Sequence, residues 1–200
     1  MPAPLRIGIT GPPAAGKSTL ARMFADLGAP VFDADAAVAA LYAPGGAAVE
    51  PIVRCWPEVR AQDGGIDRAA LREIVRSDPE ALAALEEIVH PLVAERRCRF
   101  IARAQGQGAP YVVVEIPLLF ETGAEQELDK VVYVDAPRAV RLERLRARPG
   151  FGSGLLQRLE SRLLPEEERR ARADIVIDTN MPLERLREQV RALHAQFSRP

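Results

Sequence analysis

An eight-residue stretch near the beginning of the chain has the residue types and the spacing of a phosphate-binding loop. Residues 11–18, Gly-Pro-Pro-Ala-Ala-Gly-Lys-Ser, satisfy the pattern G-x-x-x-x-G-K-[ST]. In such a loop consecutive backbone N–H groups surround an anion, and the positive end of the following helix adds to the attraction. Lys17 can reach the β- and γ-phosphates, and the Ser18 hydroxyl can ligate Mg²⁺. The stretch therefore predicts a binding site for a nucleoside triphosphate.

Two prolines lie inside this P-loop, although each of them removes a backbone donor. Because Pro12 and Pro13 precede the residues that approach the anion, we expect them to stiffen the loop while the backbone N–H groups that bind phosphate remain. The predicted nucleotide-binding residues of this segment are Gly11, Ala14, Ala15, Gly16, Lys17, Ser18 and Thr19.

Transfer of a phosphoryl group to a hydroxyl also needs a carboxylate beside the acceptor. Asp33 and Asp35 directly follow residues 30–32, a short run typical of a strand, and they lie two residues apart. Ligands bind at the carboxyl ends of the strands in open α/β sheets. One carboxylate could deprotonate the acceptor hydroxyl, while the other could hold Mg²⁺ through water or cap the next helix. The alternative is that both residues only punctuate a strand–helix turn.

Cations that cover the transferring phosphoryl group are the second requirement. Arg144 and Arg148 lie four residues apart, on one face of a predicted helix, just before a Pro-Gly break. This arrangement suits a hinged lid that brings arginines to the phosphates and excludes water. Other arginines crowd the same stretch, so a surface position for either residue remains an open alternative.

Two further polar residues allow two interpretations each. Glu115 lies inside a predicted apolar strand, where it could bind Mg²⁺ through water or make a structural hydrogen bond. His90 either faces the acceptor site or packs as a core imidazole. Because Pro91 follows it, we expect the long helix to break or kink at this point.

Composition and missing motifs exclude several classes of function. The chain has 200 residues, 48% of them hydrophobic, and its 27 basic side chains nearly balance 28 acidic ones. This balance argues against a partner that is nucleic acid or an anionic membrane. Two cysteines fit a reducing cytoplasm, and no apolar run approaches the roughly 20 residues that span a bilayer. The Asn-Lys of guanine-nucleotide switches and the Ser-Gly-Gly of transporter ATPases are also missing.

The order of predicted elements indicates an α/β fold. Strands that alternate with helices imply a mainly parallel five-stranded sheet that is covered on both faces. Asp67 is typical of a helix N-cap before residues 68–76. Apolar, β-branched runs predict strands at residues 5–10, 30–32, 111–116, 130–134 and 175–177.

Taken together, these motifs resemble the dephospho-CoA kinase family over nearly the entire chain. The P-loop is common to many families, whereas Asp-Ala-Asp, His-Pro and Pro-Leu-Leu-Phe-Glu in this order are much more specific. The chain carries Asp-Thr-Asn at residues 178–180, where the family commonly has Asp-Asn. The stretches that carry the resemblance are residues 9–11, 16–19, 33–35, 67–72, 85–91, 116–121, 171–174 and 177–178.

The resemblance implies an activity and a division of the chain. It implies transfer of the ATP γ-phosphoryl group to the ribose 3′-hydroxyl of dephospho-CoA, on a core similar to that of nucleoside monophosphate kinases. The single kinase domain, residues 1–200, would then consist of a core (1–35, 106–137 and 173–200), a helical acceptor-binding insertion (36–105) and a lid (138–172).

The resemblance also implies roles for individual residues. It points to Asp35 as the base, with Asp33 close by, and to Arg144 and Arg148 as lid cations that contact ATP. The catalytic set would be Lys17, Asp35, Asp33 and Arg144, and the residues that face dephospho-CoA would be Asp35, His90, Leu118 and Glu121.

The expected ligands are ATP, Mg²⁺ and dephospho-CoA, bound by a cytoplasmic monomer or small homo-oligomer. Two alternatives stay open at this stage. One is another small-molecule kinase, such as one that acts on a nucleoside monophosphate. The other is a non-catalytic nucleotide-binding regulator.

Overall fold

The structure is a computed structural model that describes residues 3–147 and 160–199 of the chain. The chain divides into two units, which we call the sheet unit and the helical unit. The sheet unit comprises Met1–Phe32 and Arg103–Pro200, and the helical unit comprises Asp33–Ala102. The P-loop therefore belongs to the sheet unit, whereas Asp33, Asp35 and His90 belong to the helical unit.

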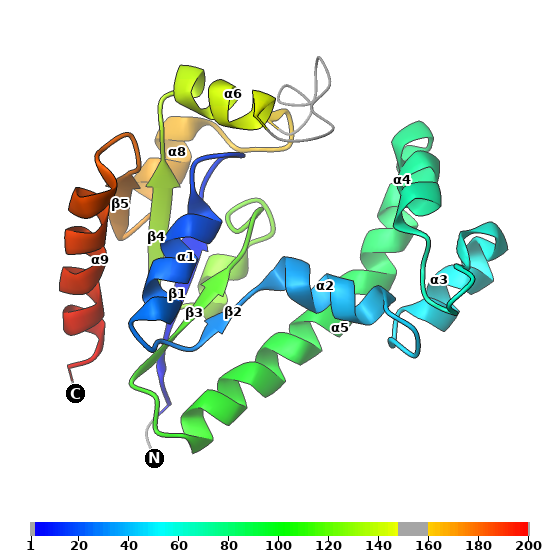
Figure 1. Cartoon of the computed structure of the whole chain (residues 1–200), viewed down its shortest axis with the longest axis horizontal. Coiled ribbons are helices and arrows are strands. Elements are labelled where there is room, and N and C mark those ends of the chain that lie inside the picture. Colours follow the sequence, from blue (N-terminus) through cyan, green and yellow to red (C-terminus); the bar gives the residue numbers. More distant parts are fainter. Residues whose placement is uncertain (1–2, 148–159, 200) are drawn as a thin grey trace. The chain divides into compact units, whose positions relative to one another are not determined.

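The sheet unit contains five parallel strands, as the alternation of elements predicted. Their order across the sheet is β2-β3-β1-β4-β5, so β1 lies between β3 and β4 (Figure 1). The loop that follows β1 therefore starts at the centre of the carboxyl edge, where open α/β sheets bind ligands. The strands are β1 (Leu5–Thr10), β2 (Val31–Phe32), β3 (Tyr111–Glu115), β4 (Lys130–Asp135) and β5 (Ile175–Asp178).

Five helical elements lie wholly in the described part of the sheet unit. They are α1 (Lys17–Asp26), the 3₁₀ helix η2 (Ala124–Glu127), α6 (Arg138–Arg146), α8 (Glu166–Ala171) and α9 (Leu183–Phe197).

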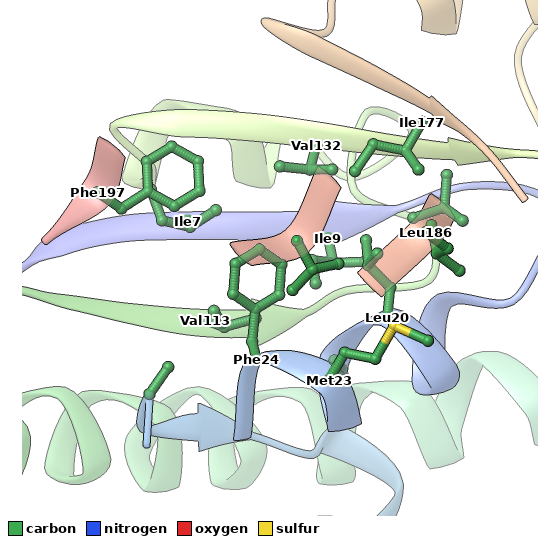
Figure 2. Packing of buried hydrophobic residues seen from close by; sticks show 14 of the residues in the cluster. Ile7, Ile9, Leu20, Met23, Phe24, Val113, Val132, Ile177, Leu186 and Phe197 are labelled. Carbon is green, nitrogen blue, oxygen red and sulfur yellow. The ribbon is translucent and has the colours of Figure 1, made fainter. Parts of the chain in front are cut away.

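Helices α1 and α9 cover one face of the sheet. Leu20 and Phe24 of α1 pack with Phe197 of α9 against the strands (Figure 2). Ile7 and Ile9 of β1 are 0% exposed in this cluster, because alternate side chains of a strand point to the same face. Burial of an apolar side chain of this size contributes about 1.5–3 kcal/mol. The packing thus anchors α1, whose first turn forms one side of the P-loop.

A second apolar cluster includes the intervening residues of β4. Val131 and Tyr133 pack there with Leu119 and Phe120, from the segment after β3, and with Leu164 before α8. Both residues alternate with the β4 side chains that face α1 and α9, so this cluster belongs to the opposite face. Apolar cover on both faces is what a parallel sheet requires.

The helical unit has its own core, formed by its helices. The predicted cap is confirmed, because the Asp67 carboxylate accepts hydrogen bonds from the backbone N–H groups of Ala69 and Ala70 at 2.9 and 3.1 Å. Its elements are α2 (Ala34–Tyr42), α3 (Val49–Cys55), the 3₁₀ helix η1 (Pro57–Val59), α4 (Arg68–Ser77) and α5 (Pro79–Gly106), of which residues 103–106 belong to the sheet unit. Its buried apolar residues are Leu41, Ala48, Val49, Ile52, Val59, Ile66, Leu71 and Val89.

Helix α5 passes through the point at which the sequence predicted a break. It has 28 residues and continues past Pro91, so the helix does not break at this proline, and a kink there stays a prediction. Proline leaves the carbonyl group four residues earlier, that of Glu87, without its helical partner. Pro91 and Glu87 are both exposed, so water can take the place of the lost donor. Neither α5 nor any other helix within residues 3–147 and 160–199 is long and apolar enough to span a bilayer.

Candidate active site

Backbone conformation alone requires the two glycines of the P-loop motif. Gly11 has a φ angle of 147° and lies so close to β4 that a Cβ atom would approach the Val134 carbonyl oxygen to 2.0 Å. Gly16, the N-cap of α1, has a φ angle of 102°. Both angles lie in the region that favours glycine. These two glycines therefore determine the backbone path at both ends of the loop.

The residues between these glycines form a tight turn. The backbone N–H of Ala15 donates to the Pro12 carbonyl oxygen at 3.2 Å, so the prolines begin the turn. Ala14 has a φ angle of 60°, which is uncommon for a residue with a side chain. The Ala15 amide, which we expected on a phosphate, is thus used within the loop in this structure. The amides of the first turn of α1 lack helical partners by geometry and remain suited to an anion.

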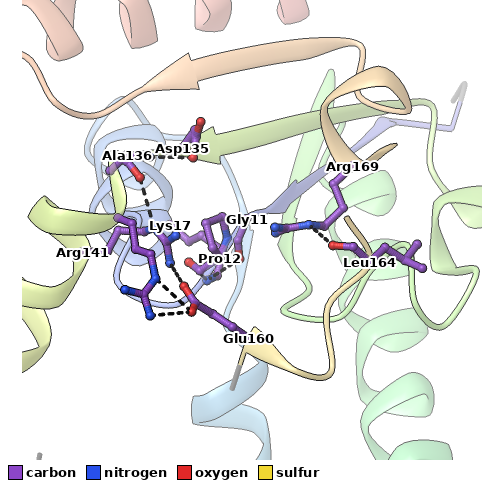
Figure 3. A network of polar contacts seen from close by, with 10 residues as sticks. Gly11, Pro12, Lys17, Asp135, Ala136, Arg141, Glu160, Leu164 and Arg169 are labelled. Carbon is purple, nitrogen blue, oxygen red and sulfur yellow. Dashed lines mark hydrogen bonds and ion pairs between the residues drawn. The ribbon is translucent and has the colours of Figure 1, made fainter. Parts of the chain in front are cut away.

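The Lys17 side chain folds back over the loop. Its ammonium group donates to the carbonyl oxygens of Gly11 and Pro12 at 3.0 and 3.2 Å (Figure 3). Phosphate oxygens would offer this ammonium group a charge-assisted hydrogen bond, which is stronger than a bond to a neutral carbonyl. The position of Lys17 fits the contact with β- and γ-phosphates that the motif predicts.

Ser18 and Glu115 form the oxygen-rich part of the site. The Ser18 hydroxyl donates to the Glu115 carboxylate at 3.3 Å, which places the end of β3 beside the start of α1. Hydroxyl and carboxylate oxygens are the ligand type that Mg²⁺ prefers. Within the described residues, no three His, Cys, Asp or Glu side chains are grouped so that they could hold a metal ion. A Mg²⁺ ion here would therefore need water and phosphate oxygens to complete its shell.

Arg144 and Thr179 hold the outer side of the P-loop. Arg144 Nη1 donates to the carbonyl oxygens of Ala14 and Ala15, both at 3.2 Å, and to Thr179 Oγ1 at 2.9 Å. Thr179 Oγ1 also lies 2.5 Å from the Ala15 carbonyl oxygen, to which it can donate. Arg144 is thus bonded to the loop itself, and its contact with a phosphate stays a prediction. Arg148 lies outside the described residues.

Two other arginines near the loop are neutralised by carboxylates. Arg141 is 5% exposed, and its Nη1 donates to Glu160 at 2.8 Å, while its Nε donates to the Ala136 carbonyl oxygen at 3.1 Å (Figure 3). Arg170 of α8 pairs with Asp135 at the end of β4. These pairs place ionic groups beside the loop, but each positive charge already has a negative partner.

The two aspartates of the helical unit occupy the start of α2 and differ in their contacts. The Asp33 carboxylate accepts a hydrogen bond from the Ala36 backbone N–H at 2.9 Å and so caps the helix. Asp35 lies in the first turn and is exposed. Its carboxylate has no hydrogen bond within residues 3–147 and 160–199. Asp33 thus performs the capping role that the sequence left open, and Asp35 stays available to a ligand.

His90 is exposed on α5, so the alternative of a core imidazole is wrong. It lines an open hollow of about 530 Å³ together with Pro91, two glutamates and an alanine of the same helix. A ligand can reach the ring from this hollow. Its contact with an acceptor stays a prediction.

The two remaining predicted acceptor residues lie after β3, in the sheet unit. Leu118 is partly buried, and its carbonyl oxygen accepts a hydrogen bond from the Thr122 hydroxyl at 2.8 Å. The Glu121 carboxylate accepts from the Leu164 backbone N–H at 2.9 Å. Glu121 therefore ties the segment before α8 to the segment after β3, and its contact with substrate stays a prediction.

The sequence matches one family over most of its length. The dephospho-CoA kinase family matches residues 5–184. The chain is 45% identical over 187 residues to a protein named dephospho-CoA kinase from Rhizobium meliloti (strain 1021), which covers 94% of this chain and 95% of that protein. The chain belongs to the dephospho-CoA kinase family. A dephospho-CoA kinase of Cereibacter sphaeroides is 44% identical over 194 residues, 97% of this chain and 96% of that protein.

Solved structures agree with the fold of a dephospho-CoA kinase. A Thermus thermophilus protein is 39% identical, with a TM-score of 0.81 and 98% of both chains covered. A dephospho-CoA kinase from Campylobacter jejuni is 21% identical, with a TM-score of 0.71 over 98% of this chain and 99% of that one. A shikimate kinase from Acinetobacter baumannii is 19% identical, with a TM-score of 0.54 over 95% and 90%. The last two likenesses concern the fold alone, and the predicted P-loop kinase fold is confirmed.

Sequence reasoning on this dephospho-CoA kinase family member did not assign a role to three residues at the P-loop end of the sheet. Thr179 belongs to the Asp-Thr-Asn stretch, and nothing local to it indicates that its hydroxyl contacts residue 15. Arg141 and Arg169 were two arginines in a crowded stretch. Both are buried, at 5% and 7% exposure, and no periodicity in this stretch distinguishes them from exposed neighbours.

Proposed function

We propose that the chain catalyses the reaction of its family, the transfer of the γ-phosphoryl group of ATP to the ribose 3′-hydroxyl of dephospho-CoA. The product is coenzyme A, and the reaction is the last step of its synthesis. The observation that carries this proposal is the family match over residues 5–184, because the P-loop alone is common to many nucleotide-binding proteins.

The P-loop and Lys17 would bind the polyphosphate. The first-turn amides of α1, from Gly16 to Thr19, would donate to phosphate oxygens, and Gly11 would let the chain approach closely. The Lys17 ammonium group would move from its two carbonyl partners to the β- and γ-phosphates. Preorganised donors of this kind stabilise the charge that develops during transfer.

Asp35 would act as the general base. It would accept the proton of the 3′-hydroxyl while the oxygen attacks the γ-phosphorus; the new bond forms as the bond to the β–γ bridging oxygen breaks, and ADP leaves. Its exposed position and lack of a partner within the described chain support this role. Asp33 would keep α2 capped and so fix the backbone that carries Asp35.

Ser18 and Glu115 would hold Mg²⁺, with water and phosphate oxygens as the other ligands. When bound, Mg²⁺ neutralises negative charge on the β- and γ-phosphates. The hydrogen bond between the two side chains supports the placement, since both oxygens already face each other.

The remaining predicted roles belong to the same proposal. Residues 138–172 would form the lid over ATP, with Arg144 and Arg148 as its cations, and residues 36–105 would bind the acceptor. His90, Leu118 and Glu121 would face dephospho-CoA. The exposed position of His90 on α5 supports the first of these three contacts.

The cellular setting is inferred from composition. Both cysteines are free thiols, which fits the reducing cytoplasm in which most thiols persist. The near balance of charge supports small-molecule substrates over nucleic acid. A monomer or a small homo-oligomer is the expected state.

The experiment is an acceptor panel with purified protein, ATP and Mg²⁺. ADP release is measured with dephospho-CoA, with AMP and CMP, and without acceptor, and mass spectrometry of the product locates the new phosphate. Coenzyme A is the matched control, because its 3′-oxygen already carries a phosphate. We expect ADP release only with dephospho-CoA. Turnover of a nucleoside monophosphate would instead identify another kinase, and ATP binding without turnover of any acceptor would identify a regulator.

A further inference from the structure

One buried arginine near the P-loop has no negative partner. Arg169 of α8 is 7% exposed, and within residues 3–147 and 160–199 no carboxylate pairs with it. Arginine is almost never buried without a partner, and an uncompensated buried charge is costly. Among the described residues, this cation therefore lacks the anion that its burial calls for.

The hydrogen bonds of Arg169 leave part of its guanidinium group unsatisfied. Its Nε donates to the Leu164 carbonyl oxygen at 2.9 Å, and its Cζ lies 5.4 Å from the centre of the Tyr133 ring. These contacts fix the orientation of the group. Its Nη1, in contrast, is buried and has no acceptor among the described residues. A buried donor in this state costs about 1–3 kcal/mol.

Arg169 stacks on a residue of β4 that lies next to the start of the P-loop. Tyr133, over which it stacks, is the register partner of Thr10, the residue just before Gly11. Gly11 itself lies against the backbone of Val134, the next residue of β4. In Figure 3 the guanidinium group extends toward Gly11 and Pro12, the same two residues that the Lys17 ammonium group contacts.

The Tyr133 hydroxyl adds a second unused group to the same place. Its oxygen is buried and has no hydrogen-bond partner in the part of the chain that the structure describes. Burial raises the pKa of Tyr133 to about 12, so the hydroxyl is protonated at neutral pH and can donate. The stacked pair therefore offers two donors, one neutral and one charged.

Neighbouring arginines show that this situation is specific to Arg169. Arg141 pairs with Glu160 at 2.8 Å. Arg172 stacks on an aromatic ring much as Arg169 does, with its Cζ 5.0 Å from the centre of the Phe120 ring, but it also pairs with two glutamates. Ring stacking in this stretch thus does not by itself leave an arginine without a counter-charge.

From this geometry we propose that Arg169 is a further catalytic residue, which binds the γ-phosphoryl group of ATP through its guanidinium group. Lys17 and Arg169 then approach the γ-phosphate from two sides of Gly11 and Pro12. Arginine suits this contact because its planar group can hold two oxygens of a phosphate at once. The inference rests on the proposed use of ATP and adds a residue to it.

The test compares binding of ATP with binding of ADP, because only ATP carries the γ-phosphoryl group. Calorimetry with Mg²⁺ and without acceptor gives both dissociation constants for the wild type and for Arg169→Met. We expect the constant for ATP to rise about 10- to 100-fold, the range for loss of a charged hydrogen bond. The constant for ADP should change less than about 3-fold. The difference between the Tm shifts that ATP and ADP cause should shrink in parallel.

Arg172→Met is the matched control, since it also removes an arginine from an aromatic ring. Its ratio of ATP to ADP affinity should equal that of the wild type. If Arg169→Met loses affinity for both nucleotides equally, or for neither, Arg169 is structural and the proposal is overturned. Should Arg169→Met not fold, Arg169→Lys decides, with an expected rise of about 3- to 10-fold for ATP alone; an unchanged ratio there overturns the proposal.

The outcome is independent of the acceptor. Failure of the proposed function would appear as missing turnover of dephospho-CoA, while a change in the ratio of ATP to ADP affinity would still report on Arg169. Tyr133→Phe tests the second donor. It should raise the dissociation constant for ATP by about 3- to 10-fold and leave that for ADP unchanged, in line with one neutral hydrogen bond.

Discussion

The sheet unit and the helical unit hold their proposed site residues in contrasting ways. In the sheet unit the P-loop is bonded from several elements: Arg144 and Thr179 contact its outer carbonyl groups, and Lys17 lies over it. In the helical unit Asp35 is exposed and without a hydrogen bond among the described residues, and only the backbone that carries it is fixed, by the Asp33 cap.

This difference indicates that the site is preorganised for the nucleotide and less so for the acceptor. A phosphate site works by donors that are in place before the ligand arrives, because reorganising them would cost free energy. A general base needs only a defined backbone position, since the acceptor hydroxyl supplies its hydrogen bond. Substitutions that remove a contact with the P-loop should therefore change nucleotide binding, whereas those of the helical aspartates should change turnover and leave nucleotide binding unaltered.

The largest effect should come from Lys17→Ala. A cation on the transferring phosphoryl group is worth about 10³- to 10⁵-fold in kcat, and we expect a loss of this order. Steady-state ADP release with dephospho-CoA measures it, and circular dichroism with a Tm measurement checks that the fold is retained. The variant should fold, so that the loss of kcat can be assigned to the missing cation. A folded variant with the kcat of the wild type would remove Lys17 from the site.

Next in size is the effect of Asp35→Asn. Loss of a general base costs about 10²- to 10⁴-fold, so kcat should fall by this factor while the dissociation constant for ATP stays within about 2-fold of the wild type. The measurement combines steady-state kinetics with calorimetry.

Asp33→Asn is the matched comparison for Asp35→Asn. Asparagine caps a helix as well as aspartate does, so this variant keeps the hydrogen bond to Ala36 and should retain most of the kcat. If Asp33→Asn loses more activity than Asp35→Asn, the roles of the two aspartates are exchanged. If Asp35→Asn weakens ATP binding as much as it slows turnover, the contrast between the units fails.

A smaller effect is expected from Arg144→Ala. Its guanidinium group supports the carbonyl groups of Ala14 and Ala15, and Ala14 is held at a φ angle of 60°. Without this support the loop must become ordered when the nucleotide binds, which costs free energy. The dissociation constants for ATP and ADP should therefore both rise about 10-fold, equivalent to roughly 1.4 kcal/mol. Thr179→Val should act in the same direction, and Thr179→Ser should not. A larger loss for ATP than for ADP would show that Arg144, besides supporting the loop, contacts the γ-phosphate as the proposed lid cation.

The sequence predicts a feature well when the residues that determine it are close to one another along the chain. The P-loop glycines are required by local backbone angles, and the Asp67 cap involves residues two and three positions away. Arg144, in contrast, finds its partners 130 and 35 positions away. No local pattern contains that information, so the sequence could name Arg144 as a cation near phosphate but could not give its hydrogen bonds.

Helix α5 and Arg169 are two further cases in which a local sequence pattern gives the wrong expectation. Proline predicts a helix end, yet α5 continues through Pro91 because packing along the rest of the helix outweighs one lost hydrogen bond. Arg169 lies in a run of charged residues that is typical of an exposed helix, yet it is buried and contacts the ring of Tyr133, 36 residues earlier in the chain. Tertiary contacts decide both cases.

The smallest effect should come from Asp129→Asn, at the end of the sheet unit where β1 and β4 begin. Hydrogen bonds from the Arg6 side chain, and one from its backbone at 2.7 Å, hold the pKa of Asp129 below its usual 3.8. A lowered pKa in the folded state stabilises the fold above pH 4, and this contribution is lost as the pH falls below 3.8. Because the side chains are 41% and 36% exposed, the variant should lose no more than about 1 kcal/mol at pH 7. Urea unfolding at pH 7 and pH 2.5 measures this, and the difference from the wild type should be smaller at the lower pH, while ATP binding at pH 7 stays unchanged. A change in ATP affinity would show that support of the P-loop extends to the opposite end of the sheet, which would enlarge the contrast with the helical unit.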